Sequence, residues 1–197
     1  MIIGLTGGIA SGKTFCAEFF RKQNFFLIDA DIIAREVVNI GSSLLDDLAK
    51  TFGADILLNN GELNRPKLRE LIITDKKNLE LLNNLMHPAI RKKILAELEL
   101  AKNEDFILLV VPLLFENKLN ELCDLTILVD IPEALQIKRG IIRDNTKAEN
   151  IERMIKNQMP RFKKIIKANF IIDNSKDKEN TIKQCEILLT KIKDIKK

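Results

Sequence analysis

The strongest constraint on the fold is a glycine-rich segment at residues 7–14, Gly-Gly-Ile-Ala-Ser-Gly-Lys-Thr, which satisfies the pattern GxxxxGK[ST]. An apolar run at residues 2–6 precedes it, and apolar residues at helical spacing follow it. In the order strand, glycine loop and helix, successive backbone N–H groups and the positive end of the helix can face one anion. The segment therefore predicts a loop that binds a phosphate group.

Each part of this loop has a defined chemical task. Lys13 is expected to reach the β- and γ-phosphates of ATP, and the hydroxyl of Thr14 is expected to hold a magnesium ion. Glycine at position 12 permits a backbone conformation that other residues rarely adopt. The predicted nucleotide-binding residues of the loop are Gly8, Ala10, Ser11, Gly12, Lys13, Thr14 and Phe15, with Thr14 as the candidate metal ligand.

The length and composition suit one small enzyme domain. The chain has 197 residues, of which 46% are hydrophobic, and no apolar run long enough to span a bilayer. Its three cysteines are far apart and form no CxxC pair, so we expect reduced, buried thiols rather than disulfides or a metal site. Because a cleaved leader would remove the glycine-rich segment, we expect a cytoplasmic protein.

The net charge of +4 conceals an excess of Lys and Arg in residues 138–197. A basic segment of this kind suits a nucleic-acid surface, a clamp for a polyphosphate, or solvated helix faces. Solvated faces are the ordinary explanation for the lysine-rich C-terminus, so the bulk charge assigns no partner. We expect small-molecule substrates, no nucleic-acid or membrane partner, and a monomer or weak homo-oligomer.

Five short apolar segments, each bounded by polar or turn residues, are candidate strands. They are residues 2–6, 25–29, 106–112, 125–130 and 170–173. Their apolarity is continuous rather than alternating, which is typical of parallel strands covered on both faces. We therefore predict a three-layer α/β fold in which helices wrap a five-stranded parallel sheet.

A long segment between the second and third candidate strands carries helical patterns instead. Candidate helices lie at residues 31–38, 42–52, 65–73, 76–86 and 88–102. We interpret residues 31–103 as a helical insertion that binds the substrate near the carboxyl ends of the strands. The predicted single domain, 1–197, then has a core at about 1–30, 104–137 and 165–197 and a lid at about 138–164.

The second candidate strand ends in Asp29-Ala30-Asp31. A carboxylate at the tip of a parallel strand can accept a proton from a hydroxyl that attacks a γ-phosphate, which makes Asp31 the candidate base. Aspartate is also a preferred helix N-cap, so both residues have an alternative structural role. Arg35, one helical turn later, is placed either to bind a substrate phosphate or to pair with Asp31.

The third candidate strand ends in Pro112-Leu113-Leu114-Phe115-Glu116, without the aspartate that motor ATPases and GTPases place there. No NKxD-like guanine reader is present either, which favours a small-molecule kinase over a nucleotide-dependent switch. Leu113 and Glu116 are candidate substrate-binding residues, although a surface role suits Glu116 equally well.

Two further regions carry candidate site residues. Arg139 and Arg143 are four residues apart and share a helix face, so they could close over the triphosphate. We predict Arg139 as a catalytic and nucleotide-binding residue. His87 precedes Pro88, which would start a new helix, so His87 is either a junction residue or a substrate contact.

Several motifs stand together in one order along the chain. They are residues 5–14, Ile28-Asp29-Ala30-Asp31, His87-Pro88, Val111-Pro112-Leu113-Leu114-Phe115-Glu116, Arg139 with Arg143, and Ile172-Asp173-Asn174. In this combination the chain resembles the dephospho-CoA kinase family, which has a P-loop kinase fold. The resemblance implies transfer of the γ-phosphoryl group of ATP to the ribose 3′-hydroxyl of dephospho-CoA, the last step of coenzyme A synthesis.

The resemblance also implies roles for individual residues. Asp31 becomes the catalytic carboxylate, Arg139 a lid arginine, Arg65 and His87 substrate-side residues, and Asn174 a neighbour of the adenine of ATP. The chain departs from the family pattern at five positions, which are Ala10, Thr14, Phe15, Asn169 and Lys176. Ala10 stands where the family has glycine, and a positive φ there would cost about 1 kcal/mol or more.

The loop, the candidate base and the lid arginines do not by themselves identify the acceptor. Three functions therefore remain open on these residues alone. They are a dephospho-CoA kinase, a kinase for another small hydroxylated or nucleotide substrate, and a module that uses ATP or GTP as a switch.

Overall fold

The computed structural model describes the backbone of residues 1–196 and the side chains of those residues except 73, 74 and 76. The described chain divides into two compact units. We call residues 1–29 with 101–197 the core unit and residues 30–100 the helical unit.

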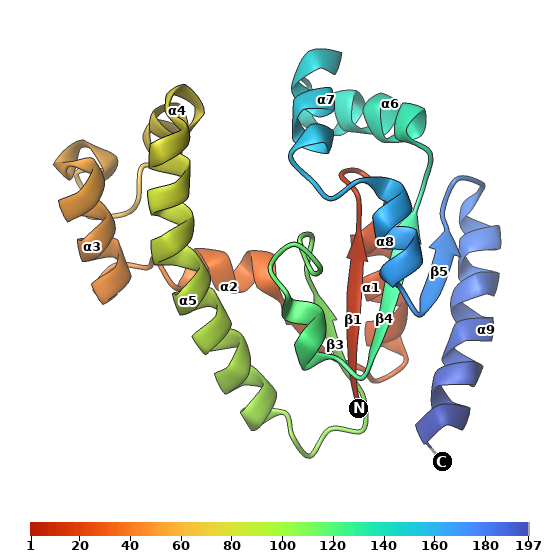
Figure 1. Ribbon diagram of the computed structural model, residues 1–197. Coiled ribbons are helices and arrows are strands. Elements are labelled where there is room, and N and C mark those ends of the chain that lie inside the picture. The colour runs from red at the N-terminus through yellow and green to blue at the C-terminus, as the bar shows by residue number, and fades with distance from the viewer. Residues whose placement is uncertain (197) are drawn as a thin grey trace. The chain divides into compact units, whose positions relative to one another are not determined.

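A five-stranded parallel sheet forms the centre of the core unit, in the order β2-β3-β1-β4-β5. The strands are β1 (Ile2–Gly7), β2 (Phe26–Asp29), β3 (Ile107–Val110), β4 (Leu125–Asp130) and β5 (Phe170–Asp173). Figure 1 shows β1 between β3 and β4. The predicted parallel sheet is confirmed, although β3 is shorter than the candidate strand at 106–112.

Five α-helices and one short 3-10 helix belong to the described core unit. They are α1 (Lys13–Lys22), η2 (Leu119–Leu122), α6 (Glu133–Asp144), α7 (Ala148–Lys156), α8 (Arg161–Lys167) and α9 (Lys178–Lys196). α1 and α9 pack against each other and supply apolar side chains to the sheet. α7 ends at Lys156, and Gln158 lies in the following loop.

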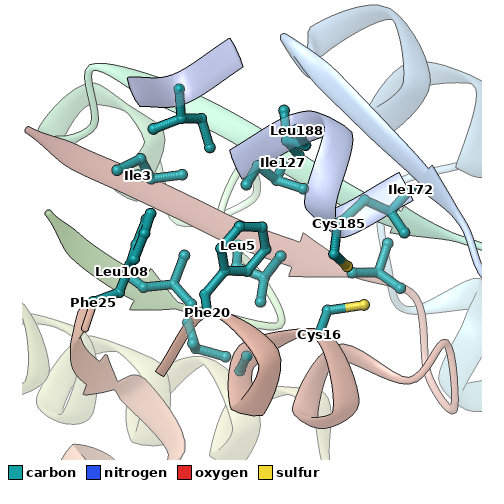
Figure 2. Packing of buried hydrophobic residues seen from close by; sticks show 14 residues of the cluster. Ile3, Leu5, Cys16, Phe20, Phe25, Leu108, Ile127, Ile172, Cys185 and Leu188 are labelled. Carbon is teal, nitrogen blue, oxygen red and sulfur yellow. The ribbon is translucent and has the colours of Figure 1, made fainter. Parts of the chain in front are cut away.

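The main core forms where these two helices meet the sheet. Leu5 of β1, Phe20 of α1 and Leu188 of α9 are buried in one cluster, together with the thiols of Cys16 and Cys185 (Figure 2). Phe20 is fully buried, and truncating a side chain of this kind costs about 3–5 kcal/mol. The continuous apolar runs of the sequence therefore correspond to strands that are covered by helices.

The helical unit contains α2 (Ala30–Glu36), α3 (Ser43–Phe52), η1 (Ala54–Ile56), α4 (Arg65–Thr74) and α5 (Lys76–Leu100). The hydroxyl of Ser42 accepts the N–H of Leu45 and caps α3, and the side chain of Asn64 accepts the N–H of Lys67 and caps α4. A second apolar cluster holds these helices together. Its buried members are Val38, Leu44, Leu48, Ile56 and Leu68.

The expected break between helices at His87 and Pro88 is wrong, because α5 runs through both residues. Proline removes the N–H that would bond to the carbonyl of Asn84, four residues earlier. Asn84 and Pro88 are both exposed, so water can satisfy that carbonyl. Leu85 and Ala89 pack on the apolar cluster on either side of the proline, which maintains the helix.

Within residues 1–196, no helix is long and apolar enough to cross a membrane.

Candidate active site

The glycine-rich loop joins the central strand of the core unit to its first helix. β1 ends at Gly7, and α1 begins directly after Gly12. The N–H of Ser11 donates to the carbonyl of Gly8 at 3.2 Å, and Gly12 has a φ of +92°. A Cβ on Gly7 would lie 2.5 Å from the carbonyl oxygen of Val129, so β4 leaves no room for a side chain. The loop is a tight turn at the carboxyl end of β1.

Several backbone N–H groups of this loop are available to an anion. Those of Ala10, Gly12 and Thr14 donate to no group in the part of the chain that the structure describes. Nζ of Lys13 donates to two carbonyl oxygens of the loop, at 3.1 and 3.5 Å. Successive N–H donors, an ammonium group and a helix N-terminus form an arrangement that binds phosphate.

The side chains of the remaining loop residues differ in exposure: that of Thr14 faces solvent, whereas those of Ser11 and Phe15 are buried or pack on the core. Thr14 is exposed, and its hydroxyl makes no hydrogen bond to a described residue, so it is available as a metal ligand. Ser11 is buried, and its hydroxyl likewise lacks a hydrogen-bond partner among the described residues. The ring of Phe15 packs against the main core, and its N–H donates to the carbonyl of Gly12 at 3.0 Å. Phe15 therefore anchors the start of α1.

Ala10 adopts a φ of +54°. This is the left-handed region, in which the Cβ of an L-residue crowds the neighbouring carbonyl at a cost of about 1–2 kcal/mol. Ala10 therefore has the backbone strain that we predicted for a residue other than glycine if this position has a positive φ.

Asn174, directly after β5, connects the loop to its surroundings. Its Nδ2 donates to the carbonyl of Ser11 at 2.7 Å, and its Oδ1 accepts the hydroxyl of Thr181 at 2.8 Å. Its backbone N–H donates to the carbonyl of Asp130, and its own carbonyl accepts a guanidinium N–H of Arg139, both at 3.0 Å. The family resemblance implied that Asn174 neighbours the adenine of ATP, which stays a prediction; its side chain in this structure contacts the phosphate-binding loop.

Arg139 and Arg143 have different partners although they share a helix. Arg143 forms a two-pronged ion pair with Asp144, at 2.7 and 2.8 Å. The Asp144 carboxylate raises the pKa of Arg143 above its usual value. Of the two arginines, only Arg139 is bonded to the segment that supports the loop.

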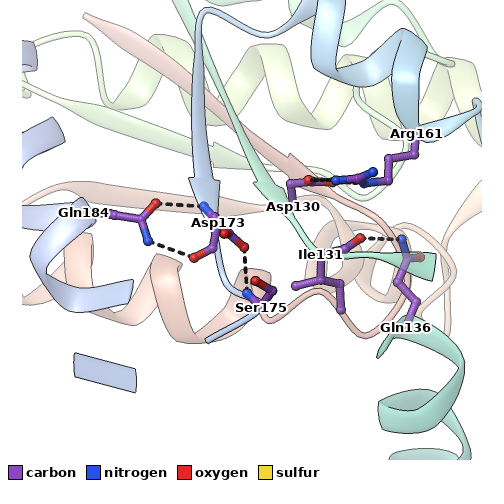
Figure 3. A network of polar contacts seen from close by, with 7 residues as sticks. All are labelled: Asp130, Ile131, Gln136, Arg161, Asp173, Ser175 and Gln184. Carbon is purple, nitrogen blue, oxygen red and sulfur yellow. Dashed lines mark hydrogen bonds and ion pairs between the residues drawn. The ribbon is translucent and has the colours of Figure 1, made fainter. Parts of the chain in front are cut away.

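A second group of side chains surrounds the carboxyl end of β4 (Figure 3). Arg161 of α8 pairs with both carboxylate oxygens of Asp130, at 2.8 and 2.6 Å, and this hydrogen-bonded pair raises the pKa of Arg161. Gln136 donates to the carbonyl of Ile131 at 3.3 Å, and it lies so close to Gly8 that a Cβ there would be 2.6 Å from its Oε1. Short-range sequence patterns gave no signal for this packing.

A cavity of about 600 Å³ opens beside the loop, within the core unit. Gly8 of the loop borders it, and its polar and charged lining comprises Asp130, Glu133, Gln136, Lys156, Gln158, Arg161 and Lys164. The cations come from α7 and α8, in the segment that we predicted to form the lid. A cavity with charged groups of both signs suits a strongly polar ligand.

Glu116 and Leu113 lie in the loop after β3, and both are partly buried. Oε1 of Glu116 accepts the N–H of Met159 at 2.8 Å and lies 3.0 Å from Nζ of Lys164. The carboxylate thus contacts the segment between α7 and α8 within its own unit.

Four predicted site residues belong to the helical unit. Asp31 lies within the first turn of α2 rather than before it, and Arg35 lies in the last turn. Arg65 begins α4 and borders a cavity of about 460 Å³, together with Val38, Ile40 and Leu63. His87 lies mid-helix. Asp31, Arg35, Arg65 and His87 are all exposed.

The described residues contain no cluster of three or more His, Cys, Asp or Glu side chains that could hold a metal ion. All three cysteines are free; Cys16 and Cys185 are buried, as expected, whereas Cys123 is only partly buried.

Comparison with known proteins identifies the family. A family model described as dephospho-CoA kinase matches residues 1–180. A dephospho-CoA kinase from Dichelobacter nodosus is 44% identical over 98% of this chain and 97% of that protein. A second, from Shewanella oneidensis, is 44% identical over 88% of this chain and 84% of its own length.

Solved structures agree on the fold. A dephospho-CoA kinase from Campylobacter jejuni, 27% identical, superimposes with a TM-score of 0.74 over 97% of this chain and 96% of that one. A shikimate kinase from Aquifex aeolicus, 18% identical, gives a TM-score of 0.56 over 99% of this chain and 98% of that one, which shows a shared fold only. With the family match covering nearly the whole sequence, the chain belongs to the dephospho-CoA kinase family.

Proposed function

We propose that the protein transfers the γ-phosphoryl group of ATP to the ribose 3′-hydroxyl of dephospho-CoA, giving coenzyme A and ADP. The observation that carries this proposal is the phosphate-binding loop, with its available N–H donors, in a chain whose family match spans residues 1–180. We further propose that it acts in the cytoplasm as a monomer or weak homo-oligomer.

In the proposed reaction, the 3′-oxygen of the acceptor attacks the γ-phosphorus, and the bond from that phosphorus to the β–γ bridging oxygen breaks. Asp31 accepts the proton of the attacking hydroxyl, and ADP leaves with the electron pair of the broken bond. The exposure of Asp31 is compatible with contact to a bound acceptor. The carboxylate thus makes the acceptor oxygen a better nucleophile as the new bond forms.

Charge develops on the phosphoryl oxygens during this transfer, and the core unit supplies groups that can stabilise it. We assign this role to the loop N–H groups, the ammonium group of Lys13 and the guanidinium of Arg139. Thr14 would hold the magnesium ion, which neutralises charge on the β- and γ-phosphates when it is bound.

The acceptor requires contacts beyond the reacting hydroxyl. We assign them to Arg35, Arg65 and His87 of the helical unit and to Leu113 of the core unit. The cavity beside Arg65 is lined by this cation, by the carboxylate of Glu62 and by the apolar side chains of Val38 and Leu63, so it offers both charged and apolar contacts to a substrate with a polar end and a less polar arm. For Glu116, its bond to Met159 and its proximity to Lys164 favour a structural role.

The test is an assay of the purified protein with ATP, magnesium and a panel of acceptors comprising dephospho-CoA, 3′-deoxy-dephospho-CoA, adenosine and shikimate. We expect a 3′-phosphorylated product, identified by mass spectrometry and phosphorus NMR, from dephospho-CoA alone. The 3′-deoxy compound is the matched control, because it lacks only the attacked oxygen. ATP consumption that is independent of the acceptor, or an equal rate with the 3′-deoxy compound, would refute the proposal.

A further inference from the structure

Asn174 connects the phosphate-binding loop to Arg139, and the proposed reaction assigns it no role. It is 8% exposed, and it makes hydrogen bonds to four different segments of the core unit. Its partners are the carbonyl of Ser11 in the loop, the carbonyl of Asp130 at the end of β4, the guanidinium of Arg139 on α6 and the hydroxyl of Thr181 on α9.

The orientation of the Asn174 amide follows from these partners. The carbonyl of Ser11 can only accept a hydrogen bond, so the atom 2.7 Å from it must be the NH₂ group. The carboxamide oxygen then faces the hydroxyl of Thr181, which donates to it at 2.8 Å. The hydroxyl of Thr181 on α9 thus fixes the orientation of the Asn174 amide, and the amide in turn binds the carbonyl of Ser11 in the loop.

The bond to Ser11 controls a donor of the phosphate-binding loop. Because a peptide unit is planar and trans, the N–H of Gly12 points opposite to the carbonyl of Ser11. Fixing that carbonyl on Asn174 therefore directs the Gly12 N–H away from Asn174. Gly12 cannot provide this control by itself, since glycine permits many backbone conformations.

The approach of Asn174 also restricts position 12 sterically. A Cβ on Gly12 would lie 2.2 Å from Nδ2 of Asn174, closer than non-bonded atoms can come. The glycine is therefore needed here for the contact with Asn174 as well as for its φ of +92°.

We propose that Asn174 is a positioning residue that sets the direction of the loop donors and, through its own carbonyl, the placement of Arg139. It acts on the triphosphate through these two groups and not through the adenine. The inference rests on the proposed use of ATP, but it concerns phosphate binding without transfer. It can therefore be tested when no acceptor is present.

The decisive measurement compares the binding of inorganic tripolyphosphate and of ATP to Asn174→Ala, by titration calorimetry with magnesium and without an acceptor. Tripolyphosphate has no base. If Asn174 positions the loop, the two ligands lose affinity by the same factor, about three- to tenfold for one lost hydrogen bond. If it contacts adenine instead, ATP loses affinity and tripolyphosphate does not, which would overturn the proposal.

Two further variants separate positioning from general loss of stability. Thr181→Val removes the donor that orients Asn174 but keeps the side-chain shape, so we expect a smaller loss of affinity for both ligands. Gln184→Ala is the matched control on α9, because Gln184 bonds to the backbone N–H and carbonyl of Asp173, at 2.9 and 2.8 Å (Figure 3), and its described hydrogen bonds include none to the loop. We expect it to lower Tm without changing either affinity.

A folded Asn174→Ala protein with unchanged affinity for tripolyphosphate would contradict the inference. If that variant does not fold, unchanged affinity in Thr181→Val would contradict it equally. Neither outcome depends on which acceptor is phosphorylated, so failure of the proposed reaction is detected separately, by the absence of product.

Discussion

Nζ of Lys164 lies 3.0 Å from Oε1 of Glu116, and both side chains are largely buried, with exposed fractions of 3% and 18%. The contact is an ion pair without directed hydrogen-bond geometry, since neither Nζ nor Oε2 of Glu116 has a hydrogen-bond partner among the described residues. Oε1 also accepts the N–H of Met159. The pair therefore ties the loop after β3 to α8 and to the wall of the larger cavity.

The first prediction concerns Glu116→Gln. The amide oxygen can still accept the N–H of Met159, so the change removes the charge and little else. It leaves the ammonium group of Lys164 buried without a counter-charge, and breaking a buried pair in this way costs about 3 kcal/mol. We expect a corresponding fall in the free energy of unfolding, measured by urea titration.

The matched control is Glu18→Gln, which breaks the exposed ion pair between Glu18 and Arg21 on α1. Exposed pairs contribute little to stability, so we expect its urea midpoint to stay close to that of the parent. Similar midpoints for the Glu116 and Glu18 variants would show that the buried pair contributes no more than a surface pair.

The second prediction concerns Ala10→Gly. At a φ of +54° the change relieves about 1–2 kcal/mol of steric strain, while the added freedom of the unfolded chain costs about 0.4–1 kcal/mol. We expect a net stabilisation of about 0.5–1 kcal/mol. Ala17→Gly, within α1, is the control of opposite sign, because glycine in a helix interior destabilises by about 1 kcal/mol. Differential scanning calorimetry should show Tm moving in opposite directions; a lower Tm for both variants would contradict the strain at Ala10.

The third prediction concerns the thiols. Burial, with a smaller contribution from the charge of Asp124, raises the pKa of Cys123 to about 12. The hydrogen bond with Cys185 and burial hold the pKa of the Cys16 thiol far above its usual range. We therefore expect iodoacetamide at pH 8 to modify neither Cys16 nor Cys123 in the native protein and to modify both in urea, as counted by mass spectrometry. Rapid native labelling of Cys123 would contradict this.

The raised pKa of Cys123 also determines whether its contribution to the free energy of unfolding rises or falls with pH. The folded thiol keeps its proton where the unfolded thiol has lost it, so this contribution to stability is complete below the unfolded pKa of about 8.5 and is lost as the pH rises through about 12. In that interval stability should fall by at most about 1.4 kcal/mol per pH unit because of this group. Urea titrations at several pH values should show a shallower fall for Cys123→Ala, and equal slopes would exclude the effect.

The features predicted from sequence are those that depend on local pattern. The loop at residues 7–14 and the five strands follow from consecutive residues, and both are present in the core unit. The passage of α5 through Pro88 was not predicted, because it depends on Leu85 and Ala89 packing on a cluster whose other members are distant in sequence. Sequence patterns favour a helix boundary at such a proline, whereas tertiary packing maintains the helix.

The supporting contacts of the site were missed for a similar reason. Asn174 is 163 positions from Ser11, and Glu116 is 43 positions from Met159. An asparagine after a strand and a glutamate after a proline-containing loop have many roles, and nothing adjacent in the sequence identifies their partners. Their resemblance to family motifs indicated that they matter, but their contacts only became evident when the fold brought distant segments together.

The last prediction concerns Asp31→Asn, which replaces the candidate base by a group of the same shape that cannot accept the proton. If Asp31 activates the acceptor hydroxyl, kcat should fall by about 10²–10⁴ while the affinity for ATP, measured without acceptor, stays unchanged. Asp29→Asn is the matched control two residues earlier, at the end of β2. Asp29 is half-buried whereas Asp31 is exposed, so we expect Asp29→Asn to affect Tm more and kcat less. A folded Asp31→Asn enzyme with near-normal turnover would assign the base to another group, and a larger loss of kcat in Asp29→Asn would move the catalytic role to Asp29.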